Sequence, residues 1–254
     1  LGNAFLTNIR EVDAIAQVVR IFSAHGGPDS VGDVIHYYGS VDPLRDIGVI
    51  NLELILADIQ TVNKRIGSIA SDIKRGDKNA VIEHGAIEKI KAVLDNEKFA
   101  NTAVLDDKEI VSAKGLHLLT MKPVLYVLNT SAASSKVDFD KSRLSGPYVE
   151  IDSVFGDGLD SLISYSYKML DLITYFTTGE DETRGWTIKR GSRAPEAGTA
   201  IHTDFKDKFI RADVIAWNKL LEAGSYAQAR EKGWVKTEGK EYIVQDGDVI
   251  EFKI

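Results

Sequence analysis

The residues best suited to chemistry stand at the ends of two predicted strands. Residues 123–128 form an apolar run with β-branched and aromatic side chains, and residues 148–152 form a second short run, so both predict strands. Polar side chains end each run and can hydrogen-bond a ligand, although an Asn after a strand commonly serves a turn or a helix cap. The four candidate binding residues are Asn129, Thr130, Asp152 and Ser153.

A second polar group, His202-Thr203-Asp204, could suggest acid–base or metal chemistry. His and Asp at this spacing are common, and no third ligand accompanies them, so neither reading is adopted. We expect Thr203 or Asp204 to cap a helix and His202 to be structural. The sequence therefore predicts no catalytic residue and no metal ligand.

A phosphate-binding loop would require G-x-x-x-x-G-K-[ST], whose backbone amides cradle phosphates while Lys and the hydroxyl serve the terminal phosphate and Mg²⁺. The Gly239-Lys240 pair continues into Glu241, so these residues do not supply that motif.

Basic residues gather in the last third of the chain and form the best local candidate for an RNA contact. A solvated surface of mixed charge is the alternative, because acidic residues lie nearby and the whole chain carries a formal charge of −7. The candidate residues are Lys189, Arg190, Arg193, Lys206, Lys208 and Arg211.

Composition sets further bounds. With 254 residues, of which 44% are hydrophobic, the chain can bury more than one core. It contains no cysteine, which excludes disulfides and thiolate chemistry, and no run is long and apolar enough for a membrane span. We expect a cytoplasmic protein that does not read DNA sequence. The chain opens at Leu1-Gly2-Asn3 without a methionine, so we expect a segment upstream.

Hydrophobic spacing predicts the elements. We expect a helix over 4–13 and a strand over 14–22, then an antiparallel helical hairpin whose seam repeats in heptads from Ile55 to Ile73. Two more helices are predicted over 108–119 and 159–172. Strand–helix–strand alternation favours a parallel sheet, and the closely spaced turns after residue 174 favour a compact mixed domain in which a small sheet grips one helix.

Several segments resemble one family, the Obg-like ATPases of the YchF type. The C-terminal third resembles the family's TGS domain, and the opening residues resemble the stretch that follows a switch segment. The matching segments are LGN (1–3), NIREVDAI (8–15), LITYFTTG (172–179), RGWTI (184–188), AIHTDF (200–205), FIRA (209–212) and YIVQDGDVIEF (242–252).

The resemblance implies an α/β fold: a P-loop NTPase core, here with a partial parallel sheet, an inserted antiparallel helical hairpin and a C-terminal β-grasp TGS domain. It places the nucleotide-binding domain at 1–45 and 118–170, the helical arm at 46–117 and the TGS domain at 171–254. It also assigns Asn129 to recognition of the nucleotide base. The family carries an acidic residue where this chain has Ala132, so guanine selectivity is not supported and the family's adenine preference is left open.

The implied function is a ribosome-associated ATPase or GTPase that prefers ATP in the parent protein, with Mg²⁺ as cofactor. The ribosome or RNA would be contacted through the TGS domain and the arm. Because residues 1–254 lack the phosphate loop, we expect them to hydrolyse nucleotide at no more than background. A non-catalytic ribosome- or RNA-binding module with a degenerate nucleotide site is the alternative, and a coiled-coil adaptor is a third.

Overall fold

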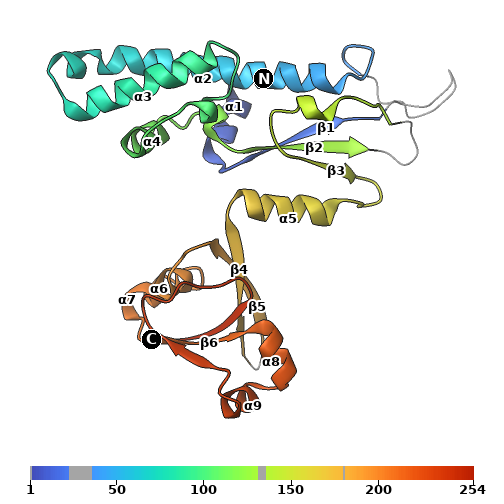
Figure 1. Ribbon diagram of the computed structural model, residues 1–254, viewed down its shortest axis with the longest axis vertical. Coiled ribbons are helices and arrows are strands. Elements are labelled where there is room, and N and C mark those ends of the chain that lie inside the picture. Colours follow the sequence, from blue (N-terminus) through green and yellow to red (C-terminus); the bar gives the residue numbers. More distant parts are fainter. Residues whose placement is uncertain (1, 23–35, 131–135, 180) are drawn as a thin grey trace. The chain divides into compact units, whose positions relative to one another are not determined.

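The computed structural model describes residues 2–22, 36–130, 136–179 and 181–254. The chain divides into two compact units, Leu1–Ser164 and Tyr165–Ile254, with the boundary inside helix α5 (Figure 1). Among the described residues, no helix combines the length and the apolar character needed to cross a bilayer.

The first unit contains a three-stranded parallel sheet in the order β1-β2-β3. Buried side chains of β1 and β2 pack against Ile47 of α2, which explains why both strands read as apolar runs. The parallel sheet predicted from strand–helix alternation is confirmed. The elements of this unit are α1 (Asn3–Glu11), β1 (Ile15–Arg20), α2 (Pro43–Lys74), α3 (Lys78–Leu94), η1 (Ala100–Thr102), α4 (Asp107–Lys114), η2 (Leu119–Met121), β2 (Val124–Thr130), η3 (Lys141–Arg143), β3 (Tyr148–Asp152) and the start of α5 (Leu159–Met169).

Helices α2 and α3 form the predicted hairpin and lie side by side (Figure 1). Asp42 and Asp77 cap their N-termini through side-chain hydrogen bonds to the backbone. The six seam residues from Ile55 to Ile73 all join one core cluster with Ile87, Ile90 and Leu94. Across the pair, Arg65 makes a two-pronged ion pair with Glu83, at 2.6 and 2.8 Å. The heptad spacing therefore identified the packed face of the hairpin.

Two predicted helix ends are wrong. The helix expected over 108–119 ends at Lys114, because Gly115 caps it and His117 adopts a left-handed conformation (φ 48°). The helix expected over 159–172 ends at Met169, because Asp171 is left-handed (φ 51°) and Leu172 begins a strand. In both places a residue with positive φ ends the helix although the apolar spacing of the sequence continues beyond it.

The second unit is built on a five-stranded mixed sheet in the order β5-β4-β8-β6-β7. Its first and last strands, β4 and β8, pair in parallel at the centre, and the other pairs are antiparallel. This arrangement is the β-grasp layout expected from the sequence. The elements are β4 (Leu172–Thr178), β5 (Thr183–Lys189), α6 (Ala194–Gly198), α7 (Asp204–Lys208), β6 (Arg211–Ala216), α8 (Trp217–Ala223), α9 (Tyr226–Glu231), β7 (Lys236–Glu238) and β8 (Asp248–Lys253).

The expected single gripped helix is replaced by short helices, which Figure 1 labels α6 to α9. The capping prediction for α7 is also wrong. The side chain of Thr203 makes no capping hydrogen bond, Asp204 forms an ion pair with Lys208 at 2.6 Å, and the His202 ring accepts from the Asp204 amide at 3.2 Å. The His202 ring therefore accepts the hydrogen bond of the first amide of α7.

Candidate nucleotide-base site

The sheet of the first unit brings the predicted site residues together. Its strands are parallel, so their carboxyl ends share one edge, where ligands of open α/β sheets bind. Asn129 lies opposite Arg20 of β1, and Thr130 lies opposite Asp152 of β3. Ser153 follows Asp152 directly and is exposed. Three of the four predicted residues are thus neighbours at this edge, with Ser153 at its rim.

Asn129 has the most informative side chain. Its Oδ1 atom is buried and finds no hydrogen-bond partner among the described residues. Its backbone carbonyl accepts from the Ile21 amide at 3.0 Å, which fixes the end of β2 against the end of β1. A buried polar atom without a partner costs about 1–3 kcal/mol, and such atoms are uncommon in folded proteins. The Asn129 Oδ1 atom is therefore a hydrogen-bond acceptor that a donor group of a ligand could satisfy.

Thr130 and Asp152 already have structural partners. The Thr130 hydroxyl donates to the Ile151 carbonyl at 2.9 Å and ties β2 to β3. Asp152 is only 5% exposed, and its Oδ1 accepts from the amides of Val154 and Phe155 at 2.9 and 3.1 Å. These bonds form the turn that follows β3. The side chains of both residues therefore stabilise this edge of the sheet. Of the predicted residues, Asn129 is the one whose Oδ1 atom has no hydrogen-bond partner among the described residues.

The turn after β3 is held close to the strand. The Asp152 amide donates to the Asp157 carbonyl at 2.9 Å, and the Gly156 amide donates to the Asp152 carbonyl at 2.8 Å. Gly158 has φ 82°, and a Cβ there would lie 2.1 Å from the Glu150 carbonyl oxygen. Only glycine fits that contact, so it sets the path of the loop beside Asp152.

An ion cluster beside the edge was missed from the sequence. Glu150 on β3 pairs with Lys136 at 2.5 Å and also with Lys141. The two lysine hydrogen bonds lower the pKa of the Glu150 carboxyl. Val137 donates to the Ile21 carbonyl at 2.9 Å, so this segment lies against the end of β1. The two lysines lie in a segment that the sequence predicts to be a polar loop. The pattern of side chains in β3 does not indicate which residue of that strand the lysines contact.

Ala132, which stands at the family's acidic position, falls outside the described residues. Across the described ranges, no group of three or more His, Asp or Glu side chains could hold a metal ion. The described donors at this edge therefore do not form a Mg²⁺ site.

The six basic candidates lie in the second unit at the end of β5, on α6 and α7, and at the start of β6. Arg190 pairs with Asp171 and Arg193 with Glu241, both at 3.1 Å. Lys208 pairs with Asp204, and Lys189 donates to the Leu170 carbonyl at 3.0 Å. Lys206 and Arg211 are exposed, and neither has an ion pair within the described part of the chain. Nearby acids thus offset three of the six charges.

Comparison with known proteins gives consistent matches. The family model "YchF-GTPase_C: Protein of unknown function (DUF933)" matches residues 172–254. The ribosome-binding ATPase YchF of Bacillus subtilis is 42% identical, covering 100% of this chain and 76% of that protein. The protein of the same name from Escherichia coli O157:H7 is 36% identical, covering 99% and 76%. The structure of the Schizosaccharomyces pombe YchF GTPase superimposes with a TM-score of 0.82 at 30% identity, covering 100% of this chain and 75% of that one.

Proposed function

Because the chain belongs to the YchF family of Obg-like ATPases, we propose that it is the base-binding and ribosome-binding part of a ribosome-associated P-loop ATPase. In this proposal the first unit contacts the purine base of ATP, or less selectively of GTP, and the second unit contacts the ribosome. Such a protein works where ribosomes are, so the proposal places it in the cytoplasm.

The unmet acceptor on Asn129 supports the nucleotide part of the proposal. The exocyclic amine of adenine is a hydrogen-bond donor that would satisfy Oδ1 on binding, and this atom has no partner among the described residues. A donor gained only in the complex contributes to affinity and to selectivity, because an analogue without the amine leaves the acceptor buried and unsatisfied.

The ribosome part rests on the relatives and on the basic set of the second unit, defined as Lys189, Arg190, Arg193, Lys206, Lys208 and Arg211. Cations on one small domain bind phosphates with an affinity that falls as salt rises. Lys206 and Arg211 are the members best placed to meet phosphate, because they do not give up a local ion pair in doing so.

Fluorescence titration with an N-methylanthraniloyl-labelled ATP tests the nucleotide part. We expect Asn129→Ala to weaken binding about fivefold to tenfold, which corresponds to one hydrogen bond of about 1 kcal/mol. Asn101→Ala, at an exposed site in the same unit, is the matched control and should bind like the wild type. Equal affinity of Asn129→Ala and the wild type would remove base recognition from Asn129.

A phosphate-release assay separates the proposal from the alternative of a non-catalytic ribosome- or RNA-binding module. Gly239-Lys240-Glu241 does not provide the phosphate-loop hydroxyl, which favours that alternative for residues 1–254 taken alone. We expect a preparation of these residues to bind labelled ATP and to release phosphate at background. Ribosome binding without any nucleotide binding would support the alternative.

A further inference from the structure

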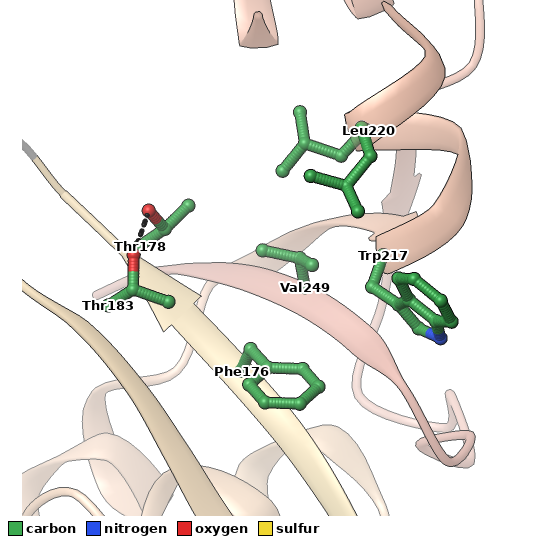
Figure 2. Close-up of a pocket in the computed structure, with 7 residues that line it drawn as sticks. Phe176, Thr178, Thr183, Trp217, Leu220 and Val249 are labelled. Atoms are coloured by element: carbon green, nitrogen blue, oxygen red, sulfur yellow. Dashed lines mark hydrogen bonds between the residues drawn. The ribbon is translucent and has the colours of Figure 1, made fainter. Parts of the chain in front are cut away.

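The second unit contains an apolar hollow that the nucleotide site does not use. It has a volume of about 260 Å³ and lies between α8 and the face of β4, β5 and β8 that packs against α8 and α9. Figure 2 shows Thr178 and Thr183 on one side of it and Trp217 and Leu220 on the other, with Phe176 and Val249 on the strands between them. Its lining residues, none of them charged, are Phe176, Thr178, Thr183, Trp217, Leu220, Leu221 and Val249.

Strand alternation explains which side chains of β4 line the hollow. Tyr175 is fully buried in the core on the α6 and α7 side, so Phe176 and Thr178 point to the opposite face. Thr178 pairs with Thr183 across the hairpin, and their hydroxyls are 2.8 Å apart. One hydroxyl donates to the other, and both threonines line the hollow.

The position of Trp217 is fixed by contacts within the second unit. Its backbone amide donates to the Gly247 carbonyl at 3.0 Å. A Cβ on Gly247 would lie 2.5 Å from the Trp217 ring, so the glycine lets the indole pack against the backbone. The side chain is nevertheless 52% exposed, and Leu221, one turn further along α8, is 72% exposed. A fixed, half-exposed Trp beside an exposed Leu is typical of the centre of a protein interface.

Charge around the hollow selects among partners. Asp181 and Glu182 immediately precede Thr183 in the hairpin, and both are exposed. Negative charge at this rim repels the phosphates of RNA and attracts a basic protein. In the basic set, Lys189 lies at the other end of β5, whereas the register places Arg211 toward the hairpin end of the sheet, three strands away from β5. Six residues of strand separate the two ends, roughly 20 Å.

We propose that this hollow receives a large apolar side chain from a basic protein segment of the ribosome. The inference rests on the proposed ribosome association and specifies which of its components this surface meets. The volume accommodates one or two such side chains, and the acidic rim contacts the flanking cations of the segment. RNA contact is assigned to the basic set, and the hollow is assigned to a protein segment.

Co-sedimentation with purified ribosomes tests the inference. Leu221→Asp should weaken binding at least tenfold, and its exposure means that the change does not threaten the fold. Ile243→Ser, at another exposed apolar site of the same unit, removes apolar surface without adding charge beside Arg193 and should stay within twofold of the wild type. Asp181→Lys with Glu182→Lys should weaken binding at least threefold. Stronger binding of that double variant would identify RNA at the hollow and overturn the inference.

A photo-crosslinking residue at position 221 identifies the partner directly. The expected product is a crosslink to a ribosomal protein, and a crosslink to ribosomal RNA would overturn the inference. The measurement on the wild type separates failure of the proposed function from failure of this inference. If the wild type does not sediment with ribosomes, the proposed function itself fails. If the wild type and Leu221→Asp sediment equally, only the assignment of the hollow fails.

Discussion

The carboxylate of Asp58, in the middle of α2, lies 2.7 Å from both the amide and the hydroxyl of Thr120. Its other oxygen accepts from the Leu119 amide at 2.9 Å, and the residue is fully buried. Thr120 in turn accepts from the Ala100 amide at 3.0 Å. Asp58 thus fixes the helical hairpin to the short segment that leads into β2 and Asn129.

Removing this carboxylate should destabilise the first unit. Asp58→Ala leaves two buried amides and a hydroxyl without an acceptor, and we expect a loss of about 3 kcal/mol in the free energy of unfolding, measured by urea denaturation. Thr120→Val removes only the hydroxyl and should cost about 1–2 kcal/mol. An Asp58→Ala protein as stable as the wild type would show that these hydrogen bonds contribute little.

The same residue predicts a pH dependence. Burial raises the pKa of Asp58 above its ordinary value of 3.8, against the lowering effect of the Thr120 and Leu119 hydrogen bonds and of nearby Arg10. The folded state therefore binds a proton more readily than the unfolded state. The stability of the wild type relative to Asp58→Ala should increase as pH falls from 7 through the raised pKa, and level off below 3.8. A relative stability that decreases over that range would give the wrong sign.

Gly158 should be far less replaceable than its neighbour Gly156. Both have a left-handed backbone, with φ of 82° and 81°, so alanine costs about 1–2 kcal/mol at either site. An added Cβ at Gly156 meets only a leucine methyl at 3.6 Å, whereas at Gly158 it meets a backbone oxygen at 2.1 Å. We expect Gly158→Ala to lose at least about 2 kcal/mol more by thermal unfolding. Equal costs would mean that the loop moves freely beside β3.

The basic set predicts a salt-dependent ribosome affinity. Lys206→Glu with Arg211→Glu should weaken co-sedimentation and flatten its dependence on salt, since both side chains are available for phosphate. Arg190→Glu should have a smaller effect, because Asp171 already offsets its charge. An unchanged salt slope for the double variant would remove these residues from the contact.

Periodicity and strand–helix alternation were enough to predict the hairpin seam and the parallel sheet, whereas the small sheet of the second unit was expected from closely spaced turns and from the family resemblance. It was insufficient where single residues reverse the backbone, as His117 and Asp171 do, because left-handed conformations leave no mark on apolar spacing. It also could not show that α7 is a short helix whose first amide donates a hydrogen bond to the His202 ring.

At the site, sequence placed Asn129 and Asp152 at strand ends, but their different states depend on tertiary contacts. Asp152 accepts hydrogen bonds within its own turn, whereas the Asn129 Oδ1 atom has no partner in the described part of the chain, and only the register and burial reveal this difference. The Glu150 cluster with Lys136 and Lys141 was missed for the same reason, since its partners are 14 and 9 residues away.

Co-sedimentation of the purified protein with ribosomes at low salt tests the account most directly. We predict saturable binding to ribosomes that weakens as salt is raised, with no pelleting of the protein when ribosomes are left out. A protein that stays in the supernatant at every ribosome concentration would contradict the account.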